Sequence, residues 1–228
     1  MKGYIHHFLL YSESPELTFE TFKIKYDLPE FFPITNFGFF KSGMLWMNNS
    51  YLEIVNYPKN LPVPNSNQLK NRFVGIALKI DLSPEQTLEF LIENKINSSE
   101  ILNEDVLDKD GKNVTIAKII LLNDYFHDFR IFFVFDTNDF FEKKEKEISM
   151  QKYSNFTKCW ISTHESLKAI ELFAKLGLIS LNEKTYRTSK DQAIEIVDSE
   201  HSSTEIISLE IQTNNRSVNI LNDLNNES

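Results

Sequence analysis

Short apolar runs followed by a helix-start signal recur along the chain. Such runs stand at 4–11, 73–80 and 158–161, and their β-branched and aromatic residues predict buried strands. Each is followed by a serine and an acidic residue, with proline between them in the first two, which predicts that a helix begins there. Ser83 with Gln86, and Ser162 with Glu165, fit the reciprocal capping box.

The helices predicted after these signals carry apolar residues at helical spacing, and we expect these stripes to face the core. The stripes are Leu17, Thr21, Ile24 and Leu28 in the first helix, Leu88, Leu91, Ile92 and Ile96 in the second, and Leu167, Ile170, Phe173 and Ala174 in the third, which Gly177 ends.

Strand-like runs follow each helix, at 37–40, 44–47 and 51–57, then at 114–122 and 129–136, and finally at 193–198 and 205–212. The order strand, helix, strands is therefore used three times, and the short connections favour antiparallel hairpins. A parallel doubly wound sheet would need further helices. We predict an α+β fold with modules at 1–57, 73–137 and 158–212, the last one partial, and a polar, flexible tail at 214–228.

Composition and charge indicate which classes of partner and which compartment the protein can have. The 228 residues carry a formal net charge of −9, which disfavours a nucleic-acid partner. The single cysteine, Cys159, stands in an apolar stretch, which indicates a buried structural thiol and a reducing compartment. No run approaches the ~20 apolar residues of a membrane helix. We expect a cytoplasmic protein that contacts no membrane.

Two strings resemble a known family. Tyr4-Ile5-His6-His7-Phe8-Leu9-Leu10 is similar to the first strand of glyoxalase-like (vicinal-oxygen-chelate) proteins, and Tyr51-Leu52-Glu53-Ile54-Val55 is similar to their closing strand. The resemblance implies βαβββ modules that form a curved, mostly antiparallel sheet around a cavity, with the helices outside. It covers 4–57 well and 73–137 in outline, and 158–212 resembles an incomplete third copy.

The resemblance also implies a site. By position, His7 and Glu53 correspond to ligands of a divalent metal, for which Fe, Mn, Ni and Zn are the candidates. Strand alternation places His7 on one face with Ile5 and Leu9, and His6 on the other. The second module departs from the pattern, because 73–80 contains no histidine and 130–135 contains no carboxylate. A hydrogen bond between His7 and Glu53 without metal is the alternative.

Two functions stay open at this point. One is a metal-dependent lyase, isomerase or dioxygenase that acts on a small oxygen-bearing substrate through His7 and Glu53. The other is a non-catalytic protein that holds a small hydrophobic or aromatic ligand in the same cavity, with Phe39 and Trp46 in the strands expected to line it. The sequence contains no nucleophile elbow and no phosphate-binding loop, and it leaves open whether the protein is a homodimer.

Overall fold

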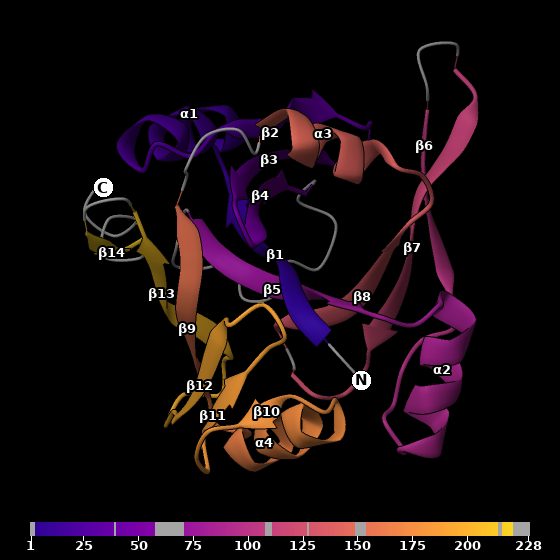
Figure 1. Ribbon diagram of the computed structural model, residues 1–228, viewed down its shortest axis with the longest axis vertical. Coiled ribbons are helices and arrows are strands. Elements are labelled where there is room, and N and C mark those ends of the chain that lie inside the picture. Colours follow the sequence, from indigo (N-terminus) through magenta and orange to yellow (C-terminus); the bar gives the residue numbers. More distant parts are fainter. Residues whose placement is uncertain are drawn as a thin grey trace.

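The chain folds into two β-sheets and four helices within its described part. The computed structural model describes residues 3–38, 40–57, 71–107, 111–126, 128–148, 154–213 and 216–220. The first sheet has eight strands in the order β2-β3-β4-β1-β5-β8-β7-β6 and curls into a half-barrel (Figure 1). It is mixed but mostly antiparallel, since only the pairs β1–β4 and β5–β8 are parallel.

The half-barrel is built from two stretches of chain with the same element order. The first runs through β1 (Gly3–Ser12), α1 (Pro15–Lys25), β2 (Glu30–Asn36), β3 (Lys41–Met47) and β4 (Ser50–Asn56). The second runs through β5 (Asn71–Ile80), α2 (Pro84–Glu93), β6 (Leu102–Leu107), β7 (Asn113–Leu122) and β8 (Arg130–Asp136). The α+β class and the βαβββ order expected from the sequence are therefore confirmed.

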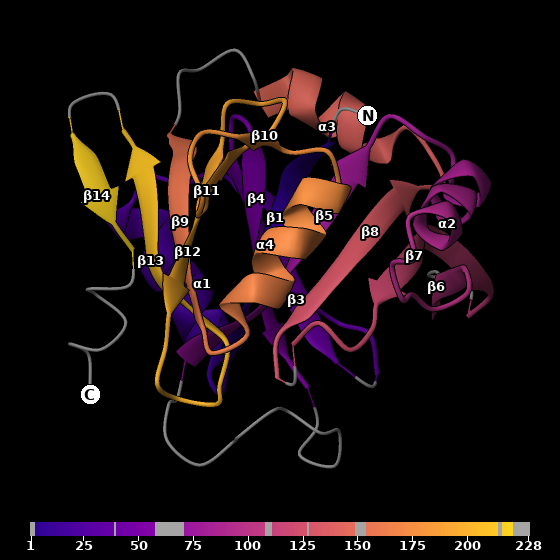
Figure 2. The ribbon, with the colours of Figure 1, turned by 90° about the horizontal axis from the view of Figure 1, so that it is seen from below.

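A second, smaller sheet follows. Helix α3 (Phe140–Ile148) leads to β9 (Asn155–Thr163), α4 (Ser166–Lys175), β10 (Ile179–Ser180), β11 (Thr185–Arg187), β12 (Ala193–Asp198), β13 (Glu205–Gln212) and β14 (Ser217–Asn219). The strand order is β10-β11-β12-β9-β13-β14 (Figure 2). Within the predicted tail, β14 pairs with β13, and Ile220 is buried.

The main core lies between the two sheets and the helices. Phe8 of β1 contacts Phe156 of β9 at 4.7 Å between ring centroids, so the outer face of the half-barrel packs against the smaller sheet. The buried side chain of Gln192 crosses this junction, because it bonds to both backbone atoms of Ile5 and to the Asn49 carbonyl. Cys159 is buried in the same core, as predicted, and burial raises the pKa of its thiol.

The prediction of which face of α1 is buried is wrong. Leu17 and Ile24 are 70% and 78% exposed, whereas Phe19 and Phe22 are buried. The buried face predicted for α2 is partly wrong, since Leu91 is buried but Ile92 is exposed. The buried face predicted for α4 is also partly wrong, because Leu167 and Ala174 are exposed while Phe173 is buried. The phenylalanines of α1 supply more apolar area than its aliphatic residues, and they decide which face turns inward.

The predicted strand at 37–40 is also wrong, because the structure has a strand at Glu30–Asn36 and a loop after it. Strand β2 contains Pro33, which cannot donate a backbone hydrogen bond. The strand tolerates it because β2 is an edge strand with register shifts against β3 around this residue.

The three helix starts differ in their capping. The box at Ser83 and Gln86 is confirmed, with both reciprocal hydrogen bonds present. The box at Ser162 and Glu165 is wrong, because α4 begins only at Ser166 and has no side-chain cap. Ser14 makes no cap bond either. Its backbone N–H donates to Ser12 Oγ at 3.1 Å instead.

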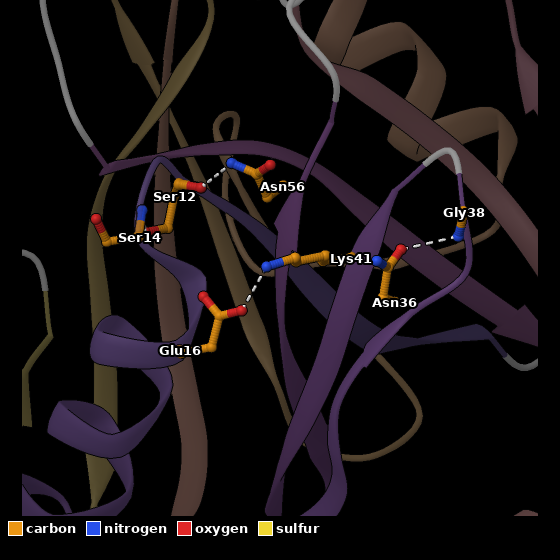
Figure 3. A network of polar contacts seen from close by, with 7 residues as sticks. All are labelled: Ser12, Ser14, Glu16, Asn36, Gly38, Lys41 and Asn56. Atoms are coloured by element: carbon orange, nitrogen blue, oxygen red, sulfur yellow. Dashed lines mark hydrogen bonds and ion pairs between the residues drawn. The ribbon is translucent and has the colours of Figure 1, made fainter.

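Strands β3 and β4 hold the turn into α1 in place. The Asn56 side chain donates to the Ser12 carbonyl at 2.7 Å, and Lys41 forms an ion pair with Glu16 of the first helical turn at 2.6 Å (Figure 3). These contacts fix the end of β1, the strand that carries both histidines. In the described residues, no helix is long and apolar enough to cross a membrane.

Candidate binding site on the inner face of the half-barrel

The structure brings His7 and Glu53 together. They lie on the adjacent parallel strands β1 and β4, where Glu53 is the register partner of Leu9, two residues beyond His7. His7 Nε2 and Glu53 Oε2 are 3.1 Å apart, and the two side chains are only 5% and 13% exposed. A buried imidazole and a buried carboxylate therefore face each other on the inner side of the sheet.

The Glu53 carboxyl group has a second partner. The Ser42 hydroxyl of β3 donates to Glu53 Oε1. Burial alone would raise the pKa of Glu53, but the close approach of His7, together with the hydrogen bond from Ser42, outweighs burial and lowers the pKa. Glu53 is therefore a carboxylate at neutral pH.

His6 lies beside His7, which corrects the prediction that the two rings point to opposite faces. The pairing of β1 with β5 shifts its register between Ile5 and His7, and this bulge rotates the strand. Ile5 consequently joins the main core, whereas His7 shares the inner face with Leu9. The two Nδ1 atoms are 2.8 Å apart.

His6 is neutral at pH 7. Burial lowers the pKa of its imidazole well below the usual range, and electrostatic interactions with His7, Lys79 and Lys190 lower it further. Because two lone pairs repel, one of the facing Nδ1 atoms must carry a proton and donate it to the other. His7 is therefore held from both sides, by His6 at Nδ1 and by Glu53 next to Nε2.

Glu104 of β6 is a site residue that the sequence reasoning missed. Burial, and then the charge of Glu53, raises the pKa of Glu104 to about 7, while His7 opposes this shift. Strand β6 is the edge strand of the second module. Because the sheet curls, Glu104 on β6 interacts electrostatically with His7 on β1 and Glu53 on β4. No motif marks this position in the sequence. In the structure Glu104 is the register partner of Ala117, which belongs to the apolar cluster on the inner face.

Apolar side chains from both modules surround this group. The buried cluster consists of Leu9, Val55, Val74, Ala77, Ala117, Phe132 and Val134, with Tyr11, Tyr57, Ile119 and Leu121 packed against it. Ala77 is the register partner of His7 on β5, and Phe132 is the partner of Ala77 on β8. The Phe132 ring lies 5.7 Å from the His7 ring, so the second module opposes His7 with apolar surface.

Helix α3 covers one end of the inner face. Phe141 lies 5.4 Å from the His6 ring and 5.7 Å from the Tyr51 ring, and the Tyr51 hydroxyl donates to Glu145. Trp46 is buried in the same cluster with Phe31 and Tyr51. Phe39, the other residue expected to line the cavity, lies outside the described residues.

These donors do not make a complete metal site. His7 and Glu53 come from one module, and the other offers Ala77 and Phe132 at the same level. No group of three or more His, Cys, Asp or Glu side chains in the described part of the chain is arranged to hold a metal ion. A catalytic zinc typically has about three protein ligands. The two protein ligands therefore do not complete a resident metal site by themselves.

Comparison with known proteins supports the architecture. No family model and no curated protein matches the sequence. The chain is similar in structure to a hypothetical protein from Staphylococcus aureus, with a TM-score of 0.69 and 12% identity over 95% of this chain and 93% of the other. It is also similar to a mutant of 4-hydroxymandelate synthase from Streptomyces coelicolor, a vicinal-oxygen-chelate protein, with a TM-score of 0.59 and 9% identity over 92% of this chain and 71% of the other. The half-barrel of βαβββ modules and these similarities together show that the chain has the glyoxalase-like, or vicinal-oxygen-chelate, fold.

Proposed function

We propose that the inner face of the half-barrel binds a small, largely apolar molecule that carries one polar group, without a resident metal. The observation that supports this most strongly is the setting of the His7–Glu53 pair. Aliphatic and aromatic side chains from both modules surround it, and His6 and Glu104 are its polar neighbours. Ligand sites of this kind combine apolar walls with a few fixed polar groups.

The polar end of the ligand would meet His7. Within the described residues, no well-aligned hydrogen bond reaches the buried Nε2 atom, although Glu53 Oε2 lies 3.1 Å away. A buried polar atom without a good partner costs about 1–3 kcal/mol. A ligand hydroxyl or carbonyl oxygen beside Nε2 and Oε2 would recover that free energy, and this favours such a ligand over a hydrocarbon.

The carboxyl groups of Glu53 and Glu104 limit which charge a ligand beside His7 can carry. Glu53 is ionised, and burial raises the pKa of Glu104 to about 7, so two carboxyl groups act on the space around His7. An anionic ligand would be repelled. We therefore infer a neutral aromatic molecule with a hydroxyl group as the ligand class.

The test uses 2-naphthol as the probe, with naphthalene as the analogue that lacks the hydroxyl group. We expect saturable binding of 2-naphthol by fluorescence, with about tenfold weaker binding of naphthalene, the effect of about 1.4 kcal/mol. Val134→Phe fills the inner face and should abolish binding, whereas Val114→Phe makes the same change at a position that is 40% exposed and should leave binding intact. Equal binding to both variants would refute the proposal.

A second candidate is an enzyme that uses a divalent metal beside His7 and Glu53, with substrate and water supplying the remaining ligands. The observation that favours it is the 3.1 Å approach of Nε2 and Oε2 without an aligned hydrogen bond, since two atoms ~2 Å from one ion lie about this far apart. Metal analysis of the purified protein and of His7→Ala decides between the two. Stoichiometric metal that disappears in His7→Ala would support the enzyme. The expected cytoplasmic location stays a prediction, and the sequence leaves open whether the protein is a homodimer.

A further inference from the structure

The smaller sheet repeats the strand register of the half-barrel. β9 pairs in parallel with β12 as β1 pairs with β4, and β13 is antiparallel to β9 as β5 is to β1. The turns after β1 and β9 also match, because Ser12 Oγ accepts from the Ser14 N–H and Thr163 Oγ1 accepts from the Glu165 N–H. Ser12 and Thr163 therefore occupy equivalent places.

This register defines an equivalent of the His7–Glu53 pair. Counting back from Ser12 and Thr163, Lys158 takes the place of His7, and Trp160 takes the place of Leu9. Glu195 is the register partner of Trp160, as Glu53 is of Leu9. Lys158 and Glu195 form an ion pair. Two modules thus place a basic and an acidic side chain in contact at the same two positions.

The pair on the smaller sheet is open to solvent. Lys158 and Glu195 are 28% and 32% exposed, against 5% and 13% for His7 and Glu53. The opposite face of β9 and β12 carries Ile161, Ile194 and Ile196, which are buried in the main core together with Phe173 of α4. Helix α4 lies beside β12 on that face (Figure 2). Strand alternation therefore puts Lys158 and Glu195 on the face that points away from α4.

An aromatic ring and further polar groups surround the pair. The Lys158 ammonium lies over the Trp160 ring, 4.4 Å from its centroid. Glu210 of β13 is the register partner of Lys158 and accepts a hydrogen bond from Ser217. Next along β13, Ser208 accepts a hydrogen bond from Asn219 at 2.5 Å. The face thus offers donors and acceptors around one partly exposed tryptophan.

We propose that this face, centred on Lys158, Trp160 and Glu195, is a second binding site and takes a neutral polyhydroxylated ligand such as a sugar. A metal ion is disfavoured, because a lysine ammonium has no lone pair to donate. An anion is disfavoured, because Glu195 and Glu210 outnumber Lys158. A second cation at the ring is disfavoured, because the ammonium already lies over it.

Once metal ions, anions and cations are disfavoured, a ligand with neutral hydroxyl groups fits this face best. Each one accepts from an ammonium or amide N–H and donates to a carboxylate, so a ligand with several of them can pair with Lys158, Glu195 and Asn219 without a charge to repel. The apolar C–H face of a sugar ring can cover the exposed part of Trp160. The site is independent of the one proposed for the inner face.

The chain contains only two tryptophans, Trp46 and Trp160, which allows a direct test. In a Trp46→Phe background, Trp160 is the only tryptophan reporter. We titrate maltose, cellobiose, sucrose and trehalose and expect a saturable change in Trp160 emission with at least one of them. Replacing Glu195 by Gln should weaken that binding by about tenfold, the loss of one charge-assisted hydrogen bond.

Two controls and two opposing outcomes complete the test. Glu205→Gln, on an exposed strand position outside the pair, should leave the titration unchanged, and urea unfolding should be similar for all variants. A linear response to all four sugars would overturn the proposal. So would tighter binding of glucosamine or glucuronic acid than of every neutral sugar, because it would mean that charge is recognised. Binding of 2-naphthol on the inner face is measured separately, so either proposal can fail alone.

Discussion

Replacing His7 by leucine tests whether the fold needs His7 to stabilise the buried carboxylate of Glu53. The change leaves an ionised carboxylate, 13% exposed, that accepts a hydrogen bond from Ser42 but has no basic partner among the residues that the structure describes. Removing one member of a buried pair costs about 3–5 kcal/mol. Because Ser42 stays, we expect His7→Leu to lower the free energy of unfolding by about 3 kcal/mol.

The double variant His7→Leu, Glu53→Met isolates the electrostatic part of this loss. It replaces both members by apolar side chains, a change that is often nearly neutral. His6 loses its Nδ1 partner in both variants, so that cost cancels in the comparison. The assay is urea unfolding at pH 7, followed by circular dichroism. We expect the double variant to be more stable than His7→Leu by about 2 kcal/mol.

The pH dependence of this difference has a defined sign. In the wild type, the lowered pKa of Glu53 contributes stability that is present above its unfolded pKa and is lost as the pH falls through the folded value. In His7→Leu the carboxyl group is buried with less support, so protonation relieves its cost. The gap between the two variants should therefore narrow from pH 7 to pH 5. Equal stability of the variants at pH 7 would refute the reasoning.

Three further predictions concern single residues. Ser83→Ala should cost about 1 kcal/mol in urea unfolding, because it removes a complete capping box, whereas Ser14→Ala should cost less, because Ser14 makes no cap bond. Gly75→Ala should lower the melting temperature, because a Cβ atom there would lie 2.6 Å from the Arg130 carbonyl oxygen, whereas Gly3→Ala meets nothing closer than 3.6 Å and should be tolerated. Glu104 should titrate near pH 7 by carbon NMR, and since burial raises its pKa, stability should fall as the pH rises from about 4.5 to 7, a slope that Glu104→Gln removes.

Much of the half-barrel could be predicted because its modules repeat local signals. The apolar strands at Tyr4 and Phe73 and the capping box at Ser83 are written in short stretches of sequence. The contact between His7 and Glu53 followed only from the resemblance, because nothing local specifies that β1 and β4 pair in parallel. Tertiary context overrode local pattern in α1, where Phe19 and Phe22 turn inward and leave Leu17 exposed.

The rest of the candidate site depends on features that a sequence does not display. The position of His6 depends on a one-residue bulge between Ile5 and His7, and alternation counted without that bulge puts His6 on the wrong face. Glu104 joins the site through the curl of the sheet. The equivalence of Lys158 with His7 needs the strand registers, because the two side chains share only a basic nitrogen atom.

A crystal structure of the protein with 2-naphthol tests the central claim most directly. We predict the naphthalene rings against Leu9, Phe132 and Val134, with the hydroxyl oxygen within about 2.6–3.2 Å of His7 Nε2 or a Glu53 oxygen. Naphthol bound elsewhere, with the inner face filled by protein side chains, would contradict the account. A metal ion coordinated by His7 and Glu53 would contradict it as well.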